Sequence, residues 1–276
     1  MENGMPLTLK TNNHVGYCAL GLIAVLLALI SGCTSPANLD QLAPHSSNPS
    51  QIIKAAPFLH RVFEKPGNGN TTRIYIEGDG RPWVTPRSHS SDPTPHRPIA
   101  FELMQLDQGH ALYLGRPCYF KTADPLCDDA RWWTSHRYSE TVVTSLVDAV
   151  QTLTLKSDDI TLVGFSGGGT LAYLMAARLP KVKRLVTIAA NLDVELWTQT
   201  RGFSTLKGSL DPALTAPLPT AIQQLHLAGS QDQSVPLAAT SGVVARQPNA
   251  ELRVISDYDH SCCWQEQWPT ILGELN

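Results

Sequence analysis

A serine stands in a glycine-rich segment near the middle of the chain. Residues 164–168 read Gly-Phe-Ser-Gly-Gly and fit the pattern G-x-S-x-G. The segment joins a short apolar run to a stretch with helical spacing, so we expect a sharp turn from strand to helix, with Ser166 projecting from it. We predict that Ser166 is a nucleophile and that the Gly167 amide forms one half of an oxyanion hole. The alternative is an incidental serine in a glycine-rich turn or a phosphate-binding turn.

A serine hydroxyl reacts at neutral pH only when a base takes its proton and an acid orients that base. Asp232 lies in residues 229–236, directly after the next-to-last predicted strand, and His260 follows the last one. Asp193, after an earlier strand, is a competing acid. Asp259 is expected to cap a turn or to be solvated, as is its neighbour Asp257.

The chain order Ser, Asp, His, together with residues 164–168 and the string G-x-x-D-x-x-V-P at residues 229–236, resembles the α/β-hydrolases from about residue 58 to the end. The resemblance implies that Ser166 attacks, that His260 acts as base and then as acid, and that Asp232 orients the imidazole. It also implies an α/β fold with a doubly wound, mostly parallel sheet. The excursion at about 193–220 allows a small cap or none.

The second half of the oxyanion hole is expected in the loop after the predicted strand at 73–77. In related hydrolases a His-Gly-x segment supplies this amide, which corresponds to Asp79 here, whereas Glu77 replaces the histidine. An acidic side chain beside an oxyanion is unfavourable unless a cation such as Arg81 or Arg116 neutralises it. The Gly80 amide remains an alternative donor.

Short apolar runs alternate with amphipathic stretches along most of the chain, which predicts one α/β domain. Residues 58–64 and 73–77 are predicted to form a β-hairpin around the Gly-Asn-Gly-Asn sequence at 67–70. Further strands are predicted at 111–115, 160–165, 185–190, 225–228 and 252–256, and helices at 99–106, 138–154, 170–179, 236–246 and 264–275.

The N-terminus contains an apolar run at residues 15–30, followed by Ser-Gly-Cys. Residues 30–33 fit a lipobox, so this part resembles bacterial lipoprotein precursors. The resemblance implies a signal peptide at 1–32, a diacylglycerol thioether on Cys33, and outer-membrane sorting because Thr34 follows it. The expected location is the bacterial cell envelope, facing the periplasm, with a polar flexible tether at 33–57 and the hydrolase domain at 58–276. An ordinary signal peptide or a short signal anchor is the alternative.

Four cysteines follow the predicted lipidation site, an even number that suits an oxidising compartment. We favour a disulfide between Cys118 and Cys127, because the intervening segment has the composition of a loop. Cys262 and Cys263 would then form a vicinal bridge or remain thiols. Neither pair has metal-ligand spacing, so no metal is predicted.

Two groups of side chains near the predicted site have uncertain roles. Four tryptophans could line an apolar acyl pocket or simply pack under loops: Trp83, Trp132, Trp133 and Trp197. Three arginines could hold an anionic substrate group or form structural ion pairs: Arg116, Arg131 and Arg137.

The composition is that of a globular protein, with 42% hydrophobic residues, 16% charged residues and a formal charge of −3. These values argue against a disordered acidic chain and against a nucleic-acid binder. We predict a serine hydrolase that cleaves the carboxylic ester or thioester of a small-molecule acyl substrate without a cofactor, attached to a membrane through Cys33. A peptidase, an amidase, an acyltransferase or a non-catalytic envelope protein of the same fold remain alternatives.

Overall fold

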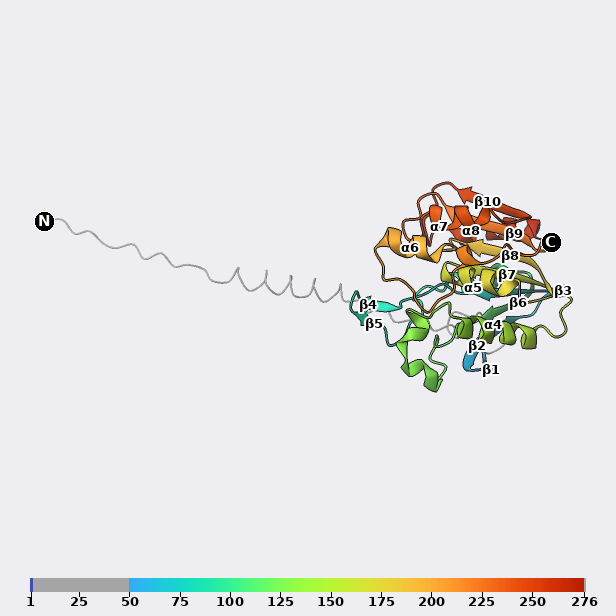
Figure 1. Ribbon diagram of the computed structural model, residues 1–276, viewed down its shortest axis with the longest axis horizontal. Coiled ribbons are helices and arrows are strands. Elements are labelled where there is room, and N and C mark those ends of the chain that lie inside the picture. The colour runs from blue at the N-terminus through green and yellow to red at the C-terminus, as the bar shows by residue number, and fades with distance from the viewer. Residues whose placement is uncertain (2–49, 276) are drawn as a thin grey trace. The chain divides into compact units, whose positions relative to one another are not determined.

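The computed structural model describes Met1 and residues 50–275, and its centre is an eight-stranded mixed sheet (Figure 1). The strand order is β1-β2-β6-β3-β7-β8-β9-β10; β2 is antiparallel to both of its neighbours, and the remaining pairs are parallel. The strands are β1 Gln51–Ala55, β2 Phe58–Lys65, β3 Asn68–Ile76, β6 Gly109–Leu114, β7 Asp159–Phe165, β8 Val182–Ile188, β9 Gln223–Gly229 and β10 Ala250–Ile255. The mostly parallel α/β architecture is therefore confirmed.

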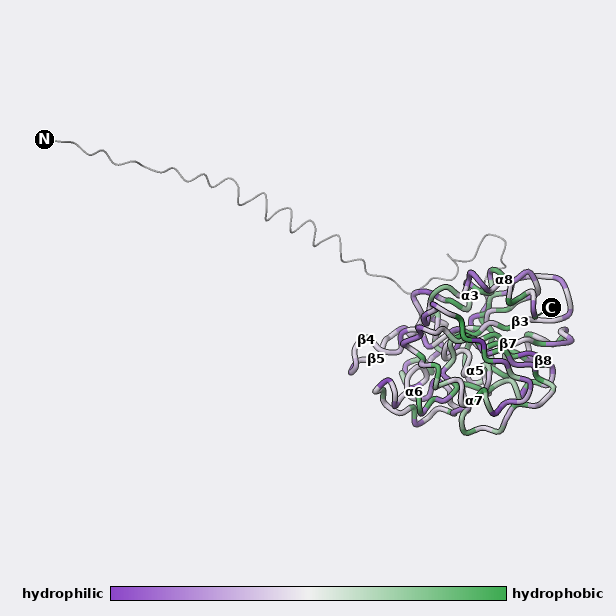
Figure 2. Tube along the Cα trace, turned by 90° about the horizontal axis from the view of Figure 1, so that it is seen from above, coloured by the Kyte–Doolittle hydropathy of each residue, from purple (hydrophilic) through white to green (hydrophobic). Residues whose placement is uncertain are grey.

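Helices cover both faces of this sheet, as Figure 2 shows for α3 and α8 on one side and α5 and α7 on the other. Helix α4 packs beside α5, while α3 contacts α8. The helices are α3 Ile99–Leu106, α4 Glu140–Leu153, α5 Gly167–Ala176, α6 Val194–Arg201, α7 Ala238–Val244 and α8 Trp264–Glu274. Helix α6 lies within the excursion at 193–220, where the sequence predicts a small cap or none.

The alternation of side chains along each strand explains why the sheet has two buried faces. In β3, Ile74 and Ile76 join the core formed with α4 and α5, whereas Tyr75 joins the core formed with α3 and α8. Successive side chains of a strand point to opposite faces, so an entirely apolar run is stable only where both faces are covered.

The predicted hairpin at residues 58–77 is wrong. Strand β6 lies between β2 and β3, paired antiparallel to the first and parallel to the second. The Gly-Asn-Gly-Asn sequence instead carries the chain past the start of β6, where a Cβ on Gly67 would collide with the carbonyl group of Gly109. The glycine-rich turn serves this close crossing of two backbones, because it removes the side chain that would block it.

The folded domain begins before the predicted boundary at residue 58. Strand β1 at Gln51–Ala55 pairs with β2 inside the range assigned to the tether. Four of its five side chains, Ile52 among them, are exposed or half-buried, as suits the edge of a sheet, and the strand follows a stretch rich in Ser, Pro, Asn and Gln that makes this region look like a linker in the sequence. The predicted signal peptide, Cys33 and the first part of the tether lie outside the described residues.

A small two-stranded sheet follows the carboxyl end of β3. It consists of β4 Trp83–Thr85 and β5 Ser88–His89, which pair antiparallel.

Among the residues that the structure describes, none of the helices has the length and apolar character needed to cross a bilayer.

Candidate active site

Ser166 occupies a tight turn between β7 and α5, as predicted for a G-x-S-x-G segment. Its φ and ψ angles of 51° and −126° lie outside the usual regions for a residue with a side chain. A Cβ on Gly164 would collide with the carbonyl oxygen of Gly168, and one on Gly168 would collide with that of Ile76. Two glycines therefore permit the close approach that raises Ser166 above the carboxyl end of the central strands.

His260 lies between Ser166 and Asp232, in the loop between β10 and α8. Its Nε2 atom is 3.1 Å from Ser166 Oγ, and its Nδ1 atom is 2.8 Å from Asp232 Oδ2. An ionised carboxylate only accepts hydrogen bonds, so Nδ1 donates its proton to Asp232 and Nε2 accepts the hydrogen bond of the serine hydroxyl. This is the tautomer that can remove the serine proton.

Asp232 is held in place by the turn after β9. Its second carboxylate oxygen, Oδ1, accepts hydrogen bonds from the backbone N–H groups of Ser234 and Val235, each at 2.8 Å. The side chain is only 2% exposed. Both oxygens are therefore occupied, and the carboxylate keeps one orientation toward His260.

The other candidate acids have local structural roles. Asp193 accepts a hydrogen bond from Leu196 N and caps α6. Asp259 accepts hydrogen bonds from the backbone of Ser261 and Cys262, which lower its pKa. The competing assignment to Asp193 is thus unsupported by its contacts, and Asp259 caps a turn as expected.

The loop after β3 reaches the serine through Gly78. A Cβ on Gly78 would lie 3.1 Å from the Cβ atom of Ser166, so the backbone at 78–79 passes directly beside the turn that carries Ser166. Gly80 faces the other way, toward the carbonyl oxygen of Pro93. In the described part of the chain, the N–H groups of Asp79, Gly80 and Gly167 donate to no acceptor. Because the backbone at 78–79 passes beside Ser166 whereas Gly80 packs against Pro93, Asp79 is better placed than Gly80 to donate to an oxyanion.

The Asp79 side chain is neutralised by two arginines, of which Arg116 is expected from the sequence and Arg137 is not. Arg116 donates to Oδ1 at 2.6 Å and Arg137 to Oδ2 at 2.8 Å. Tyr138 also donates to Oδ2 at 2.6 Å, and Tyr119 donates to the Asp79 carbonyl oxygen at 2.8 Å. We call these four residues and Asp79 the Asp79 cluster.

The charges of the Asp79 cluster determine the ionisation of its carboxyl group. Burial acts to raise the pKa of Asp79, but Arg137 and Arg116 outweigh it and hold the pKa well below its ordinary value. The carboxylate is thus ionised, and the cluster of two cations and one anion carries a net positive charge. The other predicted neutralising residue, Arg81, instead lies 2.7 Å from His96.

Glu77 lies where the resemblance drawn from the sequence implies a histidine, and among residues 50–275 no cation contributes to its pKa shift. It is buried, and its two carboxyl oxygens accept hydrogen bonds from Gly78 N and Ala100 N, both at 3.1 Å. Burial raises its pKa to about 7. Glu77 thereby links the loop after β3 to the first turn of α3, a role that its spacing in the sequence did not reveal.

Two disulfides lie near the residues of the candidate site. Cys118 is bonded to Cys127 with their Cα atoms 5.2 Å apart, and Cys262 is bonded to Cys263 just after His260. The first bridge closes the loop that carries Tyr119. No group of three or more potential metal ligands occurs among residues 50–275.

Most of the singled-out tryptophans and arginines pack or form ion pairs. Trp133 is buried and donates to Ser90 O, Trp132 packs on Phe58, and Trp197 donates to Ser234 O. Trp83 is 45% exposed. The arginines form ion pairs: Arg116 and Arg137 with Asp79, and Arg131 with Asp129.

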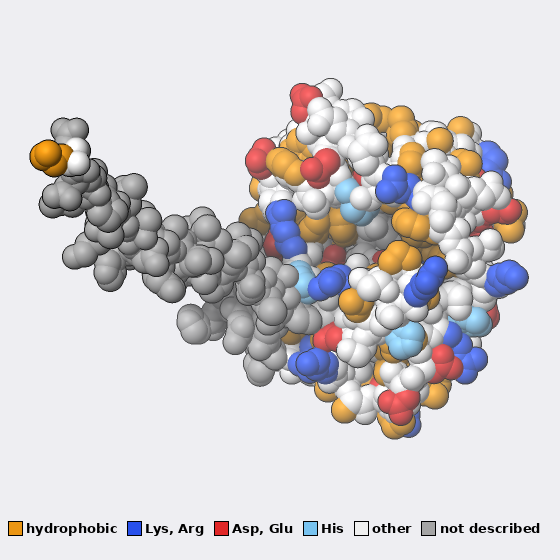
Figure 3. All heavy atoms as spheres, turned by 90° about the vertical axis from the view of Figure 1, so that its left-hand side faces the viewer, with side chains coloured by type: hydrophobic (Ala, Val, Ile, Leu, Met, Phe, Trp, Pro, Cys, Tyr) orange, Lys and Arg blue, Asp and Glu red, His pale blue; other side chains and the backbone are white. Residues whose placement is uncertain are grey.

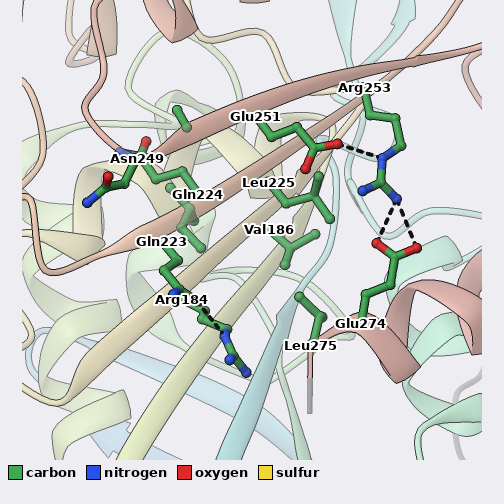
Figure 4. A pocket seen from close by; sticks show the side chains of 12 residues that line it. Arg184, Val186, Gln223, Gln224, Leu225, Asn249, Glu251, Arg253, Glu274 and Leu275 are labelled. Carbon is green, nitrogen blue, oxygen red and sulfur yellow. Dashed lines mark hydrogen bonds and ion pairs between the residues drawn. The ribbon is translucent and has the colours of Figure 1, made fainter.

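The molecular face that carries the β4–β5 hairpin and α6 is hollowed near its centre, with hydrophobic and acidic side chains inside and basic side chains around it (Figure 3). A separate cavity of about 390 Å³ opens at the amino ends of β8, β9 and β10, the end of the sheet opposite to Ser166 (Figure 4). There Arg253 pairs with Glu251 and Glu274, while Arg184 donates to the side-chain oxygen of Gln223 at 3.0 Å.

Comparison with known proteins identifies the fold. No protein-family model and no curated protein matches the sequence. Among solved structures, an esterase/lipase from an uncultured bacterium is similar with a TM-score of 0.59 at 16% identity, covering 93% of this chain and 96% of that one. Est1E from Butyrivibrio proteoclasticus gives 0.56 at 16%, with 83% and 97% covered. An esterase from Pyrococcus furiosus gives 0.57 at 16%, with 82% and 89% covered. The chain has the α/β-hydrolase fold.

Proposed function

We propose that the protein is a serine hydrolase that cleaves a carboxylic ester or thioester through an acyl-enzyme intermediate. The observation that carries this proposal is the chain of two contacts by which His260 joins Ser166 Oγ, at 3.1 Å, to Asp232 Oδ2, at 2.8 Å. Esterases among the structurally similar proteins support the substrate class. The substrate is a small acyl compound, and the reaction needs only the chain's own side chains and water.

In the proposed reaction, Ser166 Oγ attacks the carbonyl carbon while His260 Nε2 takes the hydroxyl proton. Asp232 stabilises the resulting imidazolium. The N–H groups of Gly167 and Asp79 donate hydrogen bonds to the oxyanion. Collapse of the tetrahedral intermediate breaks the bond to the alcohol or thiol, which leaves with the proton from His260.

The acyl group is then transferred to water by the same groups in reverse. His260 takes a proton from a water molecule, and the hydroxide attacks the acyl carbon. The second tetrahedral intermediate releases the carboxylic acid, and His260 returns the proton to Ser166 Oγ. The cycle consumes one water molecule and restores the free serine.

A fluorophosphonate probe tests the proposal directly, because it labels only an activated serine. We expect the wild-type protein to be labelled and Ser166→Ala to remain unlabelled, with Ser241→Ala in α7 as a control that labels like wild type. A folded wild-type protein that is never labelled would contradict the proposal. Turnover of p-nitrophenyl esters of increasing acyl length would then define the acyl group that the site prefers.

We also propose that the protein is a lipoprotein of the bacterial cell envelope, anchored in the outer membrane through Cys33 and facing the periplasm. The lipobox at residues 30–33 supports this proposal, and the disulfide between Cys118 and Cys127 is compatible with an oxidising compartment. Cys33→Ala should move the protein from the membrane fraction to the soluble fraction. An unchanged membrane fraction would contradict lipidation.

A further inference from the structure

The Asp79 cluster combines features that a purely structural ion pair does not require. Arg116 and Arg137 are 1% and 4% exposed, so both lie beneath the surface, while the Asp79 side chain remains 14% exposed at the site. Their guanidinium groups hold different oxygens of one carboxylate. The side chain of a loop residue is thereby fixed from below at both oxygens.

The backbone of Asp79 is fixed as well. Tyr119 donates to the carbonyl oxygen of Asp79 at 2.8 Å, and the neighbouring Gly78 N–H donates to Glu77. With the side chain and the carbonyl group both held, the N–H group of Asp79 is the polar group of this residue that has no partner in the described chain. A buried or partly buried donor without a partner at such a position is available to a ligand.

The carboxylate is also in contact with the nucleophile turn. A Cβ on Gly167 would collide with the Asp79 carboxylate, and Tyr138 Oη lies just behind at 2.5 Å from the same point. The two amides proposed to bind the oxyanion therefore belong to residues that touch each other. Any shift of the Asp79 side chain changes the spacing between these amides.

We propose that Arg116, Tyr119, Arg137 and Tyr138 are positioning residues for the reaction of Ser166, holding Asp79 so that its N–H group is preset to bind the oxyanion. This inference rests on the proposed hydrolase function. It explains why an acidic residue is acceptable beside the oxyanion: the two arginines exceed its charge, and their net positive charge favours the negative intermediate.

The four positioning residues are themselves held in place, so they support the loop after β3 rigidly. Tyr119 follows Cys118, whose disulfide closes the loop, and Arg137 is fixed by donating to Thr134 O at 2.7 Å. Tyr138 directly precedes the N-cap of α4 and is held through its backbone by Ser209 Oγ. A preset donor does not have to reorganise as the charge develops, which is the main source of oxyanion stabilisation.

The test compares tyrosine-to-phenylalanine substitutions that each remove one hydroxyl group. Tyr119→Phe and Tyr138→Phe remove hydrogen bonds to Asp79. Tyr75→Phe is the matched control, because the buried Tyr75 hydroxyl donates to the Asp107 carboxylate at 2.7 Å, away from Ser166. All three should lower the urea midpoint of unfolding by similar amounts.

The proposal predicts that only the two Asp79 variants lose reactivity. Their rate constants for fluorophosphonate labelling and their kcat for a p-nitrophenyl ester should fall about tenfold, with KM unchanged, since a misplaced donor weakens the transition state and not ground-state binding. The affinity for a boronic acid that forms a tetrahedral adduct with serine should fall in parallel. Tyr75→Phe should stay within about twofold of wild type in each assay.

The outcomes separate the two proposals. Unchanged kcat and boronate affinity in folded Tyr119→Phe and Tyr138→Phe, with a wild type that is labelled, would overturn the positioning role alone. Equal losses in Tyr75→Phe would also overturn it, because they would reflect general destabilisation. A wild type that neither reacts with the probe nor hydrolyses any ester would overturn the hydrolase function and this inference together.

Discussion

Two aspartates near opposite ends of the same sheet have closely similar partners. Asp107 precedes β6 at the amino ends of the strands, where it accepts hydrogen bonds from Tyr75 at 2.7 Å and from Arg73 at 2.9 Å. Asp79 follows β3 at the carboxyl ends, where Tyr138 and two arginines donate to it. Each carboxylate thus combines a tyrosine hydroxyl with guanidinium groups in a buried setting.

The difference between the two lies in what each carboxylate holds. Asp107 ties the strand partners Arg73 and Tyr75 to the start of β6, where it also accepts from Gly109 N at 2.9 Å. All of these groups belong to the sheet or its immediate connection. Asp79 instead ties a loop beside Ser166 to side chains from another loop and from the start of α4. The same chemistry stabilises the sheet at one end and the loop beside Ser166 at the other.

Removing the charge of each carboxylate should separate these roles most clearly. Asp79→Asn removes the anionic partner of the buried Arg116 and Arg137, and Asp107→Asn removes the carboxylate that pairs with the buried Arg73. We therefore expect each substitution to lower the free energy of unfolding by about 3–5 kcal/mol. Only Asp79→Asn should also lose about 100-fold in labelling rate, because the loop beside Ser166 then shifts. Urea unfolding and fluorophosphonate kinetics, corrected for the folded fraction, measure both effects. A comparable loss of labelling in Asp107→Asn would remove the distinction.

A methyl group on Gly167 tests the contact between the Asp79 cluster and the nucleophile turn. Gly167→Ala should lower the labelling rate about 100-fold, since its Cβ would displace the Asp79 carboxylate. In an Asp79→Gly/Tyr138→Phe background, which removes both groups that the Cβ would meet, the same substitution should cost much less. The control is Gly242→Ala in α7, whose Cβ would meet open space and which should stabilise the helix by about 0.5–1 kcal/mol. Additive effects of Gly167→Ala and of Asp79→Gly/Tyr138→Phe would contradict the contact.

The parts of the site that depend on local sequence could be predicted. The turn at residues 164–168 requires small residues within five positions, and Asp232 and His260 each follow a recognisable strand. Their approach to Ser166 follows from the topology, because parallel strands present their carboxyl ends at one edge of the sheet. This is why the meeting of Ser166, Asp232 and His260 at one edge of the sheet follows from the sequence, while their catalytic roles stay a prediction.

The parts that depend on distant contacts could not be predicted in the same way. Arg137 and Tyr138 are 58 and 59 residues from Asp79 in sequence, and no spacing rule relates them to it. The insertion of β6 between β2 and β3 is a similar case, since the glycine-rich turn at 67–70 is as compatible with a hairpin as with a crossing. Strand β1 likewise lies at the edge of the sheet directly after a polar stretch, and its five residues are too few to show by periodicity where the folded domain begins.

Glu77 is a third buried carboxyl group, and unlike Asp79 and Asp107 it forms no ion pair with an arginine in the described part of the chain. Its pKa is raised by burial from 4.5 to about 7, so between these values the folded protein holds more protons than the unfolded chain. The free energy of unfolding must therefore fall as the pH rises through this range, by about 3 kcal/mol from Glu77 alone. His226, whose pKa is lowered by burial to about 4, acts in the opposite direction between about 4 and 6.5.

The contribution of Glu77 is isolated by measuring the free energy of unfolding as a function of pH for wild type and for Glu77→Gln, and subtracting the wild-type values from those of the variant. The difference in free energy of unfolding, variant minus wild type, should rise by about 3 kcal/mol between pH 4.5 and pH 8, because only the wild type must bury a charge at high pH. Urea titrations at several pH values measure it. A difference that stays constant with pH would show that Glu77 does not titrate in this range. Asp79→Asn should have no such rise, since the pKa of Asp79 is lowered.

The smallest expected effect comes from removing the disulfide between Cys118 and Cys127, which closes the loop that carries Tyr119 of the Asp79 cluster. Replacing both Cys118 and Cys127 by serine should lower the free energy of unfolding by about 2–3 kcal/mol, the value expected for a loop of about ten residues. The labelling rate should fall about threefold, because Tyr119 is then held less firmly against Asp79.

A double-mutant cycle decides whether the disulfide acts on reactivity through Tyr119. If it does, the Cys118→Ser/Cys127→Ser change should reduce the labelling rate in wild type but leave it nearly unchanged in Tyr119→Phe, where the hydrogen bond to the Asp79 carbonyl is already absent. Equal reductions in both backgrounds would mean that the loop influences Ser166 by another route. Because the destabilisation should be the same in both backgrounds, the cycle separates the stability of the loop from the position of Asp79.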